Sequence, residues 1–323
     1  MKNSRARIFG AFMAGLLWSG VASAQDYPTK AVKIVVPFTA GSATDILART
    51  VGQKLGEIWG QTVIIDNRPG AGGTIGAGAV AKSPADGYTL MVHSAAQAVN
   101  PFIYPGLPYD TLKDFAQVAP LAGQPNVLVV APSLGYKSVA DLIADAKKRP
   151  GALNFGSAGM GSGTHINGEK FKLAAAIDVM HIPYKGTPEA LTDTMGGRVT
   201  YFFSPISAAL PLVRDGKLLA LGVSSAKRSA VLPNVPTIAE SGLPGFDYNL
   251  WVGMFAPAGT PSEVVAKINR DVNRVLREPE VKERMAALGA EGMSMTPAEF
   301  DKFVRAEMDE AAKVVKAAAI KVQ

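Results

Sequence analysis

The chain has 323 residues, and 33 lysines and arginines against 27 aspartates and glutamates give it a formal net charge of +6. Because the basic residues are scattered rather than clustered, this charge does not indicate a nucleic-acid surface. The sequence has no cysteine, which excludes disulfides, thiolate metal sites and cysteine nucleophiles, and its three histidines argue against a histidine-rich metal site. We expect no metal and no cofactor.

The first 24 residues have the pattern of a secretory signal peptide. Three basic residues precede an uncharged apolar run at 8–18, and Ala22-Ser23-Ala24 provides the small-x-small site that signal peptidase requires. The run is shorter than the roughly 20 apolar residues of a transmembrane helix. We therefore expect removal of residues 1–24, a mature chain that begins at Gln25, and a soluble periplasmic product; the alternative is a buried N-terminal helix.

Short apolar strands alternate with helices through most of the mature chain. The expected strands are residues 32–36, 62–65, 88–92, 127–130, 153–156, 181–184, 199–203 and 218–223. The last third is expected to be mainly helical, with helix starts at Thr260-Pro261-Ser262-Glu263 and Thr296-Pro297-Ala298-Glu299, each offering a threonine cap, a proline and a capping glutamate. Strands rich in valine, isoleucine and leucine, each followed by a helix, indicate an α/β fold of mainly parallel sheets flanked by helices.

Two turns, at residues 37–45 and 156–165, share one physical design. Each lies between a strand and a helix and consists of side chains small enough for a ligand to approach the backbone. A helix N-terminus offers unpaired N–H groups and about half a positive charge, so each turn can bind a carboxylate or phosphate without lysine or arginine. The alternative is an ordinary connection with a serine cap. Ser42 and Asp45 also have capping-box spacing, in which case Asp45 would serve only its helix.

Catalytic and nucleotide-binding motifs are weak. Neither Ser157 nor Ser162 fits the G-x-S-x-G nucleophile elbow. Ser162 and His165 lie three residues apart at a helix start, so an exported serine hydrolase that uses this pair is an alternative to a capping serine and a first-turn histidine. The glycines at 70–76 lack the spacing of a dinucleotide loop, and no acidic residue follows at the distance expected for ribose binding.

Further motifs occur in a definite order along the mature chain. They are Tyr27-Pro28 with residues 32–45, Asp66-Asn67-Arg68-Pro69-Gly70-Ala71-Gly72-Gly73, residues 86–90, Asn100-Pro101, residues 107–110, residues 157–165, Pro183-Tyr184-Lys185-Gly186, residues 233–242 and residues 255–261. In this order they resemble the Bug family, the periplasmic receptors of tripartite tricarboxylate transporters. The resemblance runs from Tyr27 to the C-terminal helix.

The resemblance implies a two-lobed periplasmic binding protein, a type II Venus flytrap without catalytic activity, in which two turns clasp a ligand carboxylate through backbone amides and ordered water. Carried onto this chain, the ligand-binding residues are Phe38, Ala40, Gly41, Ser42 and Asp45; Ser94, Ala95 and Ala96; Ser157, Ala158, Gly159, Ser162 and His165; and Tyr184 and Ser204. Ser42 follows Gly41 where a Gly-Gly pair is usual, which adds a hydroxyl. Ser204 stands where many members carry an aspartate, which favours a plain carboxylate over an amino acid.

We therefore expect a monomeric extracytoplasmic solute receptor that binds a small carboxylate between its lobes and delivers it to a membrane permease. Lobe 1 is expected to combine residues 25–126 and 224–323, and lobe 2 to consist of residues 127–223. A ligand-sensing partner of a membrane sensor is a third possibility, because transport and sensing both depend on lobe closure.

Overall fold

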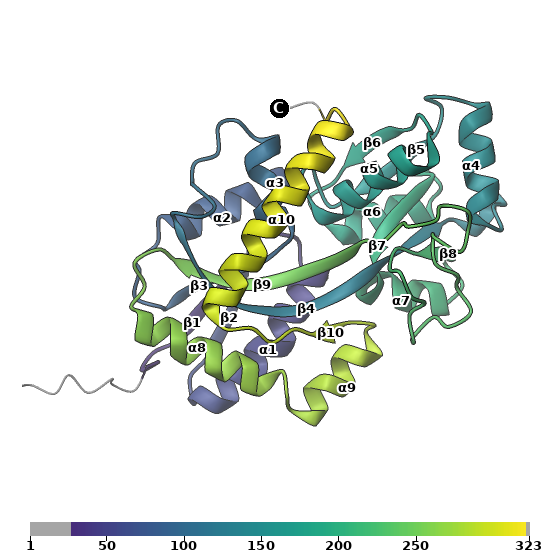
Figure 1. Ribbon diagram of the computed structural model, residues 1–323. Coiled ribbons are helices and arrows are strands. Elements are labelled where there is room, and N and C mark those ends of the chain that lie inside the picture. Colours follow the sequence, from purple (N-terminus) through teal and green to yellow (C-terminus); the bar gives the residue numbers. More distant parts are fainter. Residues whose placement is uncertain (1–26, 321–323) are drawn as a thin grey trace, which may run out of the picture.

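The structure, a computed structural model, describes residues 27–320 and consists of two α/β lobes (Figure 1). The expected signal peptide lies outside the described residues. The lobes share one long strand, β4 (Phe115–Val130), which crosses from the first sheet into the second. Its residues 115–125 pair with β9 (Asn249–Pro257), and its residues 126–129 pair with β7 (Tyr201–Pro205). β4 therefore links the sheets of the two lobes into one continuous sheet.

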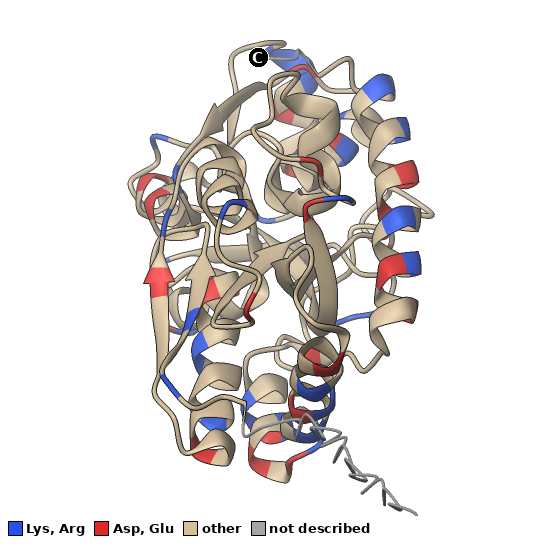
Figure 2. Ribbon diagram, turned by 90° about the vertical axis from the view of Figure 1, so that its left-hand side faces the viewer, with Lys and Arg blue, Asp and Glu red and all other residues tan. Residues whose placement is uncertain are grey.

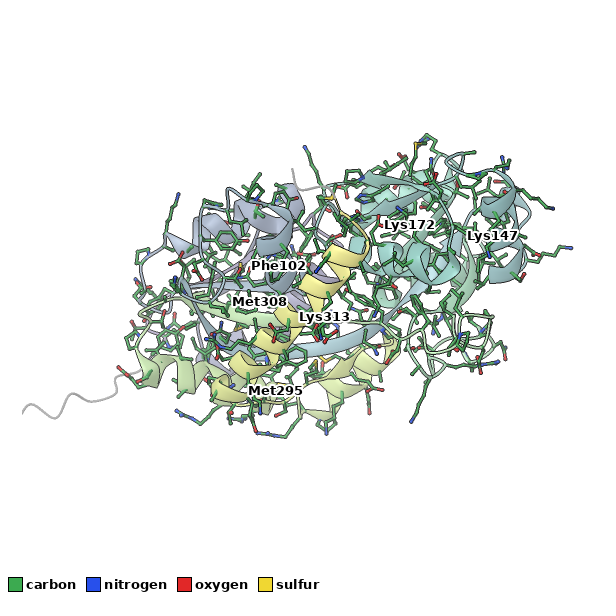
Figure 3. All side chains as sticks on the ribbon, turned by 45° about the horizontal axis from the view of Figure 1, so that its top comes forward. Phe102, Lys147, Lys172, Met295, Met308 and Lys313 are labelled. Carbon is green, nitrogen blue, oxygen red and sulfur yellow. The ribbon has the colours of Figure 1, made fainter. Side chains whose placement is uncertain are left out.

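Lobe 1 contains a sheet with the strand order β2-β1-β3-β9-β4. β1 is parallel to β2 and β3, whereas β9 is antiparallel to both of its neighbours. The further elements of this lobe are β1 (Val32–Val36), α1 (Ala43–Trp59), β2 (Val63–Asn67), α2 (Thr74–Ala81), β3 (Thr89–Ser94), α3 (Ala96–Ile103), α8 (Ser262–Val275), α9 (Pro279–Ala287), β10 (Glu291–Gly292) and α10 (Pro297–Ala317). The helix α10 lies across this lobe and carries Met308 (Figure 3).

Lobe 2 continues the strand order as β4-β7-β5-β6, with β8 on β4. β5 is parallel to β6 and β7, whereas β7 and β8 are antiparallel to β4. Its remaining elements are α4 (Val139–Lys148), β5 (Asn154–Ser157), α5 (Gly163–Ala175), β6 (Met180–Pro183), α6 (Thr187–Met195), α7 (Ile206–Arg214) and β8 (Leu219–Val223). The α/β two-lobed fold is thus as predicted, but the sheets are mixed rather than mainly parallel.

The antiparallel pairs of lobe 1 involve residues 115–125 of β4 and the strand β9, neither of which the sequence pattern predicts. Only residues 127–130 of β4 form an unbroken apolar run, and the preceding part contains Gln117, Pro120 and Gln124, with register shifts after Gln117 and Pro120. Bulges of this kind bend a strand and interrupt the alternation from which strands are recognised. The sequence therefore shows the end of β4 and not its passage through lobe 1.

Each lobe buries its own apolar cluster, and these clusters bear on the lobe boundary. Ile238 and Phe246 pack in the core of lobe 2 with Phe171 and Phe203, although the sequence placed residues 224–323 in lobe 1. At the crossing, Asn126 and Ser224 exchange hydrogen bonds, and the Tyr248 amide donates to the Ser224 carbonyl. We propose that the second boundary lies near Asp247, so that residues 224–246 belong to lobe 2.

Of the two predicted threonine caps, one forms in the structure and the other does not. Thr296 forms the expected capping box with Glu299 at the start of α10. Thr260 does not cap α8, because its hydroxyl donates to the Pro257 carbonyl at 2.7 Å and the helix begins two residues later. Along the outer helices, lysine and arginine positions are interspersed with aspartate and glutamate positions (Figure 2).

Candidate functional site

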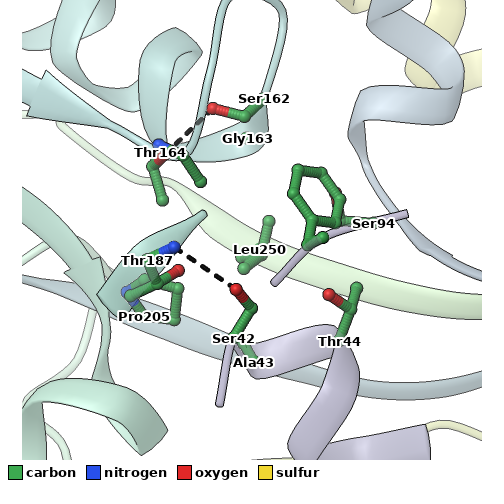
Figure 4. Close-up of a pocket in the computed structure, with 12 residues that line it drawn as sticks. Ser42, Ala43, Thr44, Ser94, Ser162, Gly163, Thr164, Thr187, Pro205 and Leu250 are labelled. Carbon is green, nitrogen blue, oxygen red and sulfur yellow. Dashed lines mark hydrogen bonds between the residues drawn. The ribbon is translucent and has the colours of Figure 1, made fainter. Parts of the chain in front are cut away.

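A small cavity lies between the lobes, where helix N-termini from both lobes meet (Figure 4). Its volume is about 20 Å³, room for about one water molecule. The lining consists of Phe38, Ser42, Ala43, Thr44, Ser94, Ala158, Ser162, Gly163, Thr164, Thr187, Pro205 and Leu250. No charged side chain belongs to this lining, and residues 27–320 contain no group of three or more side chains that could hold a metal ion.

Four helices begin at the cavity wall. α1 starts after Ser42, α5 after Ser162, α6 at Thr187 and α7 after Pro205, so lobe 1 contributes one of these N-termini and lobe 2 contributes three. Each helix N-terminus carries about half a positive charge, and the first turns of α1 and α6 also contain Asp45 and Glu189, neither of which lines the cavity. The cavity is therefore suited to an anion that is bound without lysine or arginine.

In the first turn, Asp45 shapes the backbone rather than the cavity. Its carboxylate accepts the Gly41 N–H at 2.8 Å, the Arg49 Nε–H at 3.0 Å and the Asn67 side-chain amide at 3.0 Å. Burial raises the pKa of Asp45, but the hydrogen bonds from these three groups outweigh it and hold the pKa below its ordinary value. The capping box expected for this turn does not form, because the Ser42 side chain makes no cap bond and Asp45 binds the Gly41 amide instead.

The second turn satisfies most of its backbone amides with its own side chains. The N–H of Ala158 donates to Thr164 Oγ1 at 2.9 Å, that of Gly159 to Ser157 Oγ at 3.1 Å, and that of Gly161 to His165 Nδ1 at 3.1 Å. Ser162 Oγ caps α5 by accepting the His165 N–H at 3.2 Å. These bonds fix the turn before any ligand arrives.

At the starts of α1 and α5, four amides of cavity-lining residues remain free. Within the described part of the chain, the N–H groups of Ala43 and Thr44 at the start of α1, and of Gly163 and Thr164 at the start of α5, have no hydrogen-bond acceptor. All four residues line the cavity, two from each lobe. A carboxylate held between them would bridge the lobes.

The serine and histidine of the hydrolase alternative do not form a catalytic pair. His165 Nδ1 accepts the Gly161 N–H, and its Nε2 lies 3.7 Å from Glu169 Oε1, so neither ring nitrogen serves Ser162. Ser162 Oγ is engaged as the cap and lies 3.0 Å from Thr164 Oγ1. A different contact, Ser157 Oγ to His181 Nε2 at 2.6 Å, is behind the turn, where Ser157 is fully buried.

Of the residues predicted for the site, Phe38, Ser42, Ser94, Ala158 and Ser162 line the cavity. The others lie beside or behind it: Ala40, Gly41, Asp45, Ala95, Ala96, Ser157, Gly159, His165, Tyr184 and Ser204. The Tyr184 hydroxyl donates to Asp193 at 2.6 Å, and the Ser204 hydroxyl donates to the Pro205 carbonyl at 3.2 Å. Whether these residues contact a ligand remains a prediction.

Seven lining residues are not among the ligand-binding residues predicted from the sequence, although four of them fall inside the two predicted anion-binding turns. They are Ala43, Thr44, Gly163, Thr164, Thr187, Pro205 and Leu250. The first residues of α1 and α5 follow from the helix-start argument itself, and Thr187-Pro188 was visible as a third helix start. No sequence signal identifies Leu250, which enters the cavity from β9.

Direct contacts join the lobes on both sides of the cavity. On one side, Thr39 Oγ1 donates to Glu189 Oε2 at 3.1 Å and the Thr187 N–H donates to Ser42 Oγ at 3.3 Å. On the other, the Tyr104 hydroxyl donates to the Met160 carbonyl at 3.0 Å. This is a closed arrangement, and it explains the small cavity.

Comparison with known proteins agrees with this geometry. Residues 47–320 match the model of the family described as the tripartite tricarboxylate transporter family receptor. The chain is 38% identical to the protein BugT of Bordetella pertussis over 311 residues, which cover 96% of this chain and 95% of that protein.

No helix in the described part of the chain is long and apolar enough to span a membrane.

Two solved structures resemble this fold over nearly the whole described chain. An R. palustris protein with adipate has a TM-score of 0.89 and 39% identity, covering 92% of this chain and 100% of that one. MatC from Rhodopseudomonas palustris with bound malate has a TM-score of 0.85 and 34% identity, covering 90% and 100%.

Proposed function

This chain belongs to the tripartite tricarboxylate transporter receptor family, whose members are periplasmic solute receptors rather than enzymes, and we propose that it binds a small carboxylate between its lobes and delivers it to a membrane permease. The observation that carries the proposal is the set of four free amides at the starts of α1 and α5. They come from opposite lobes and converge on a cavity whose lining is uncharged.

The lining also indicates which carboxylates fit. Hydroxyls of Ser94, Thr164 and Thr187 can hydrogen-bond an oxygen-bearing ligand, whereas Phe38 and Leu250 suit a short carbon chain. No aspartate or glutamate lines the cavity, so an ammonium group would have no counter-charge. Since two similar structures hold adipate and malate, we propose a plain dicarboxylate rather than an amino acid.

Binding must involve movement of the lobes. A cavity of about 20 Å³ cannot hold a dicarboxylate, so the lobes must separate for entry, and the ligand-bound form must leave a larger space between the lobes than the arrangement described here. A ligand that contacts both lobes favours the closed form over the open form. Periplasmic location, action as a monomer and delivery to a permease follow from the family resemblance and remain part of the proposal.

Thermal-shift screening of stripped, refolded protein tests the ligand class, with adipate and malate as the first probes and matched amino acids and monocarboxylates for comparison. A ligand that binds the native state raises the melting temperature. We expect the dicarboxylates to give the largest shifts, confirmed by calorimetry. Stabilisation by aspartate or glutamate but not by malate would overturn the plain-carboxylate assignment.

Transport and sensing require a separate experiment. Uptake of the labelled ligand by cells that lack this receptor should be lost and should return when the receptor is supplied. Unchanged uptake, with loss of a transcriptional response to the same ligand, would support the sensory role instead.

A further inference from the structure

A stack of aromatic rings lies directly behind the second turn. The His165 and His181 rings have centroids 4.0 Å apart with an interplanar angle of 19°, and the Phe155 ring lies 4.8 Å from His181 and 6.4 Å from His165, so the three rings form a triangular cluster. β5 and β6 are parallel, and their register places Phe155 opposite His181. None of these rings lines the cavity, so the stack is support for the turn and not part of its surface.

Each of the two histidines contacts one residue of the second turn. The Gly161 N–H can only donate, so the His165 Nδ1 that faces it at 3.1 Å must be the unprotonated ring nitrogen. His181 Nε2 lies 2.6 Å from Ser157 Oγ, and that oxygen accepts the Gly159 N–H. The Gly161 amide is therefore held directly by the His165 ring, and the Gly159 amide is held indirectly by the His181 ring through Ser157 Oγ.

The backbone of residues 159–161 bears on both the anion site and the contact between the lobes. It leads directly into Gly163 and Thr164, two cavity-lining residues whose amides are free. It also touches the other lobe, since a Cβ at Gly161 would lie 2.6 Å from Asn100 Oδ1 and the Met160 carbonyl accepts the Tyr104 hydroxyl. A displacement of the turn would therefore disturb both the anion site and lobe closure.

We propose that His165 and His181 are positioning residues, which hold the second turn in its anion-binding geometry through Gly161 and Ser157 without touching the ligand. This inference rests on the proposed function and assigns to His165 a role other than the direct ligand contact expected from the family resemblance. Nothing in the stack requires a proton transfer, so the role is geometric.

Matched amide substitutions test the proposal, because asparagine places its Oδ1 near the position of a histidine Nδ1, whereas glutamine places its terminal amide near Nε2. His165→Asn should keep adipate and malate affinity within about threefold of wild type, while His165→Gln should weaken it about tenfold or more, since a buried N–H loses its acceptor. At position 181 the order should reverse, with His181→Gln retaining affinity and His181→Asn losing it. Equal affinities for the asparagine and glutamine variants at both positions would overturn the proposal.

A measurement on the wild-type protein without ligand keeps the proposal testable if a variant fails to fold. Nitrogen-15 NMR should show His165 as the tautomer protonated on Nε2 and not on Nδ1, and the Gly161 amide should exchange slowly with solvent. A His165 protonated on Nδ1 would overturn the proposal. If wild-type protein bound neither adipate nor malate, the ligand assignment would fail, whereas the NMR result would still show whether His165 Nδ1 accepts the Gly161 N–H.

Discussion

Replacement of Gly186 by alanine should weaken ligand binding while leaving each lobe folded. Gly186 precedes α6 and has φ −174° and ψ −177°, an extended conformation open to any residue. A Cβ at this position would lie 1.9 Å from Thr39 Oγ1 and 2.9 Å from Ser42 Oγ, and both atoms belong to the opposite lobe. The clash therefore exists only when the lobes are closed.

The expected magnitude follows from the cost of overpacking, about 1–3 kcal/mol. Because this cost applies to the closed form alone, the affinity for adipate or malate should fall about 5- to 150-fold. Without ligand, the melting temperature should stay close to that of the wild type. Small-angle scattering should show a smaller ligand-induced decrease in radius of gyration for the variant.

Two variants serve as controls in calorimetry. Gly106→Ala adds a methyl group where no atom lies within 4 Å and should bind as wild type. Thr39→Ala removes the hydroxyl nearest to the new methyl group, so the double variant with Gly186→Ala should recover part of the lost affinity. If Gly186→Ala bound with wild-type affinity, the ligand-bound form could not keep the close approach of Gly186 to Thr39 and Ser42.

Further predictions concern pH, salt, the α5 cap and export. Burial lowers the pKa of His93 to about 3, of His165 to about 3 and of His181 to about 2, whereas unfolded histidine titrates near 6.5. Below pH 6.5 the unfolded state therefore binds more protons than the native state, and the free energy of unfolding should fall by up to about 1.4 kcal/mol per pH unit for each histidine. Glu169 and Lys172 are the charged groups nearest to His165 and His181. Urea unfolding that is unchanged between pH 7 and 5 would contradict burial of these histidines in the neutral form. Ligand affinity should change little with ionic strength, because amides in a closed cleft are screened less than exposed cations, and a steep salt dependence in calorimetry would indicate lysine or arginine contacts instead. Ser162→Ala removes the cap of α5 and should cost about 1 kcal/mol in urea unfolding with a loss of ligand affinity, whereas unchanged stability would show that the cap is dispensable. The exported protein should have the mass of a chain that begins at Gln25, and a mass that retains residues 1–24 would contradict the signal-peptide assignment.

The sequence by itself determined the parts of this protein that depend on near neighbours. The small-residue turns before α1 and α5, and the cap at Ser162, were predictable because a helix start is set by residues three or four apart. The spacing of neighbouring residues also correctly predicted Thr296 as a cap. The same spacing wrongly predicted Thr260 as a cap, because its hydroxyl donates to the Pro257 carbonyl instead.

Tertiary structure alone decided which of these local features meet. The starts of α6 and α7 join the cavity because the two lobes close on each other, with the Thr187 N–H donating to Ser42 Oγ of lobe 1. Asp45 and His165 are predicted ligand-binding residues, and the structure adds that each side chain accepts a hydrogen bond from a backbone amide of its own turn, a contact that the sequence did not indicate. Side-chain direction depends on packing between residues far apart in the chain, such as His165 against His181, and no local spacing encodes that contact.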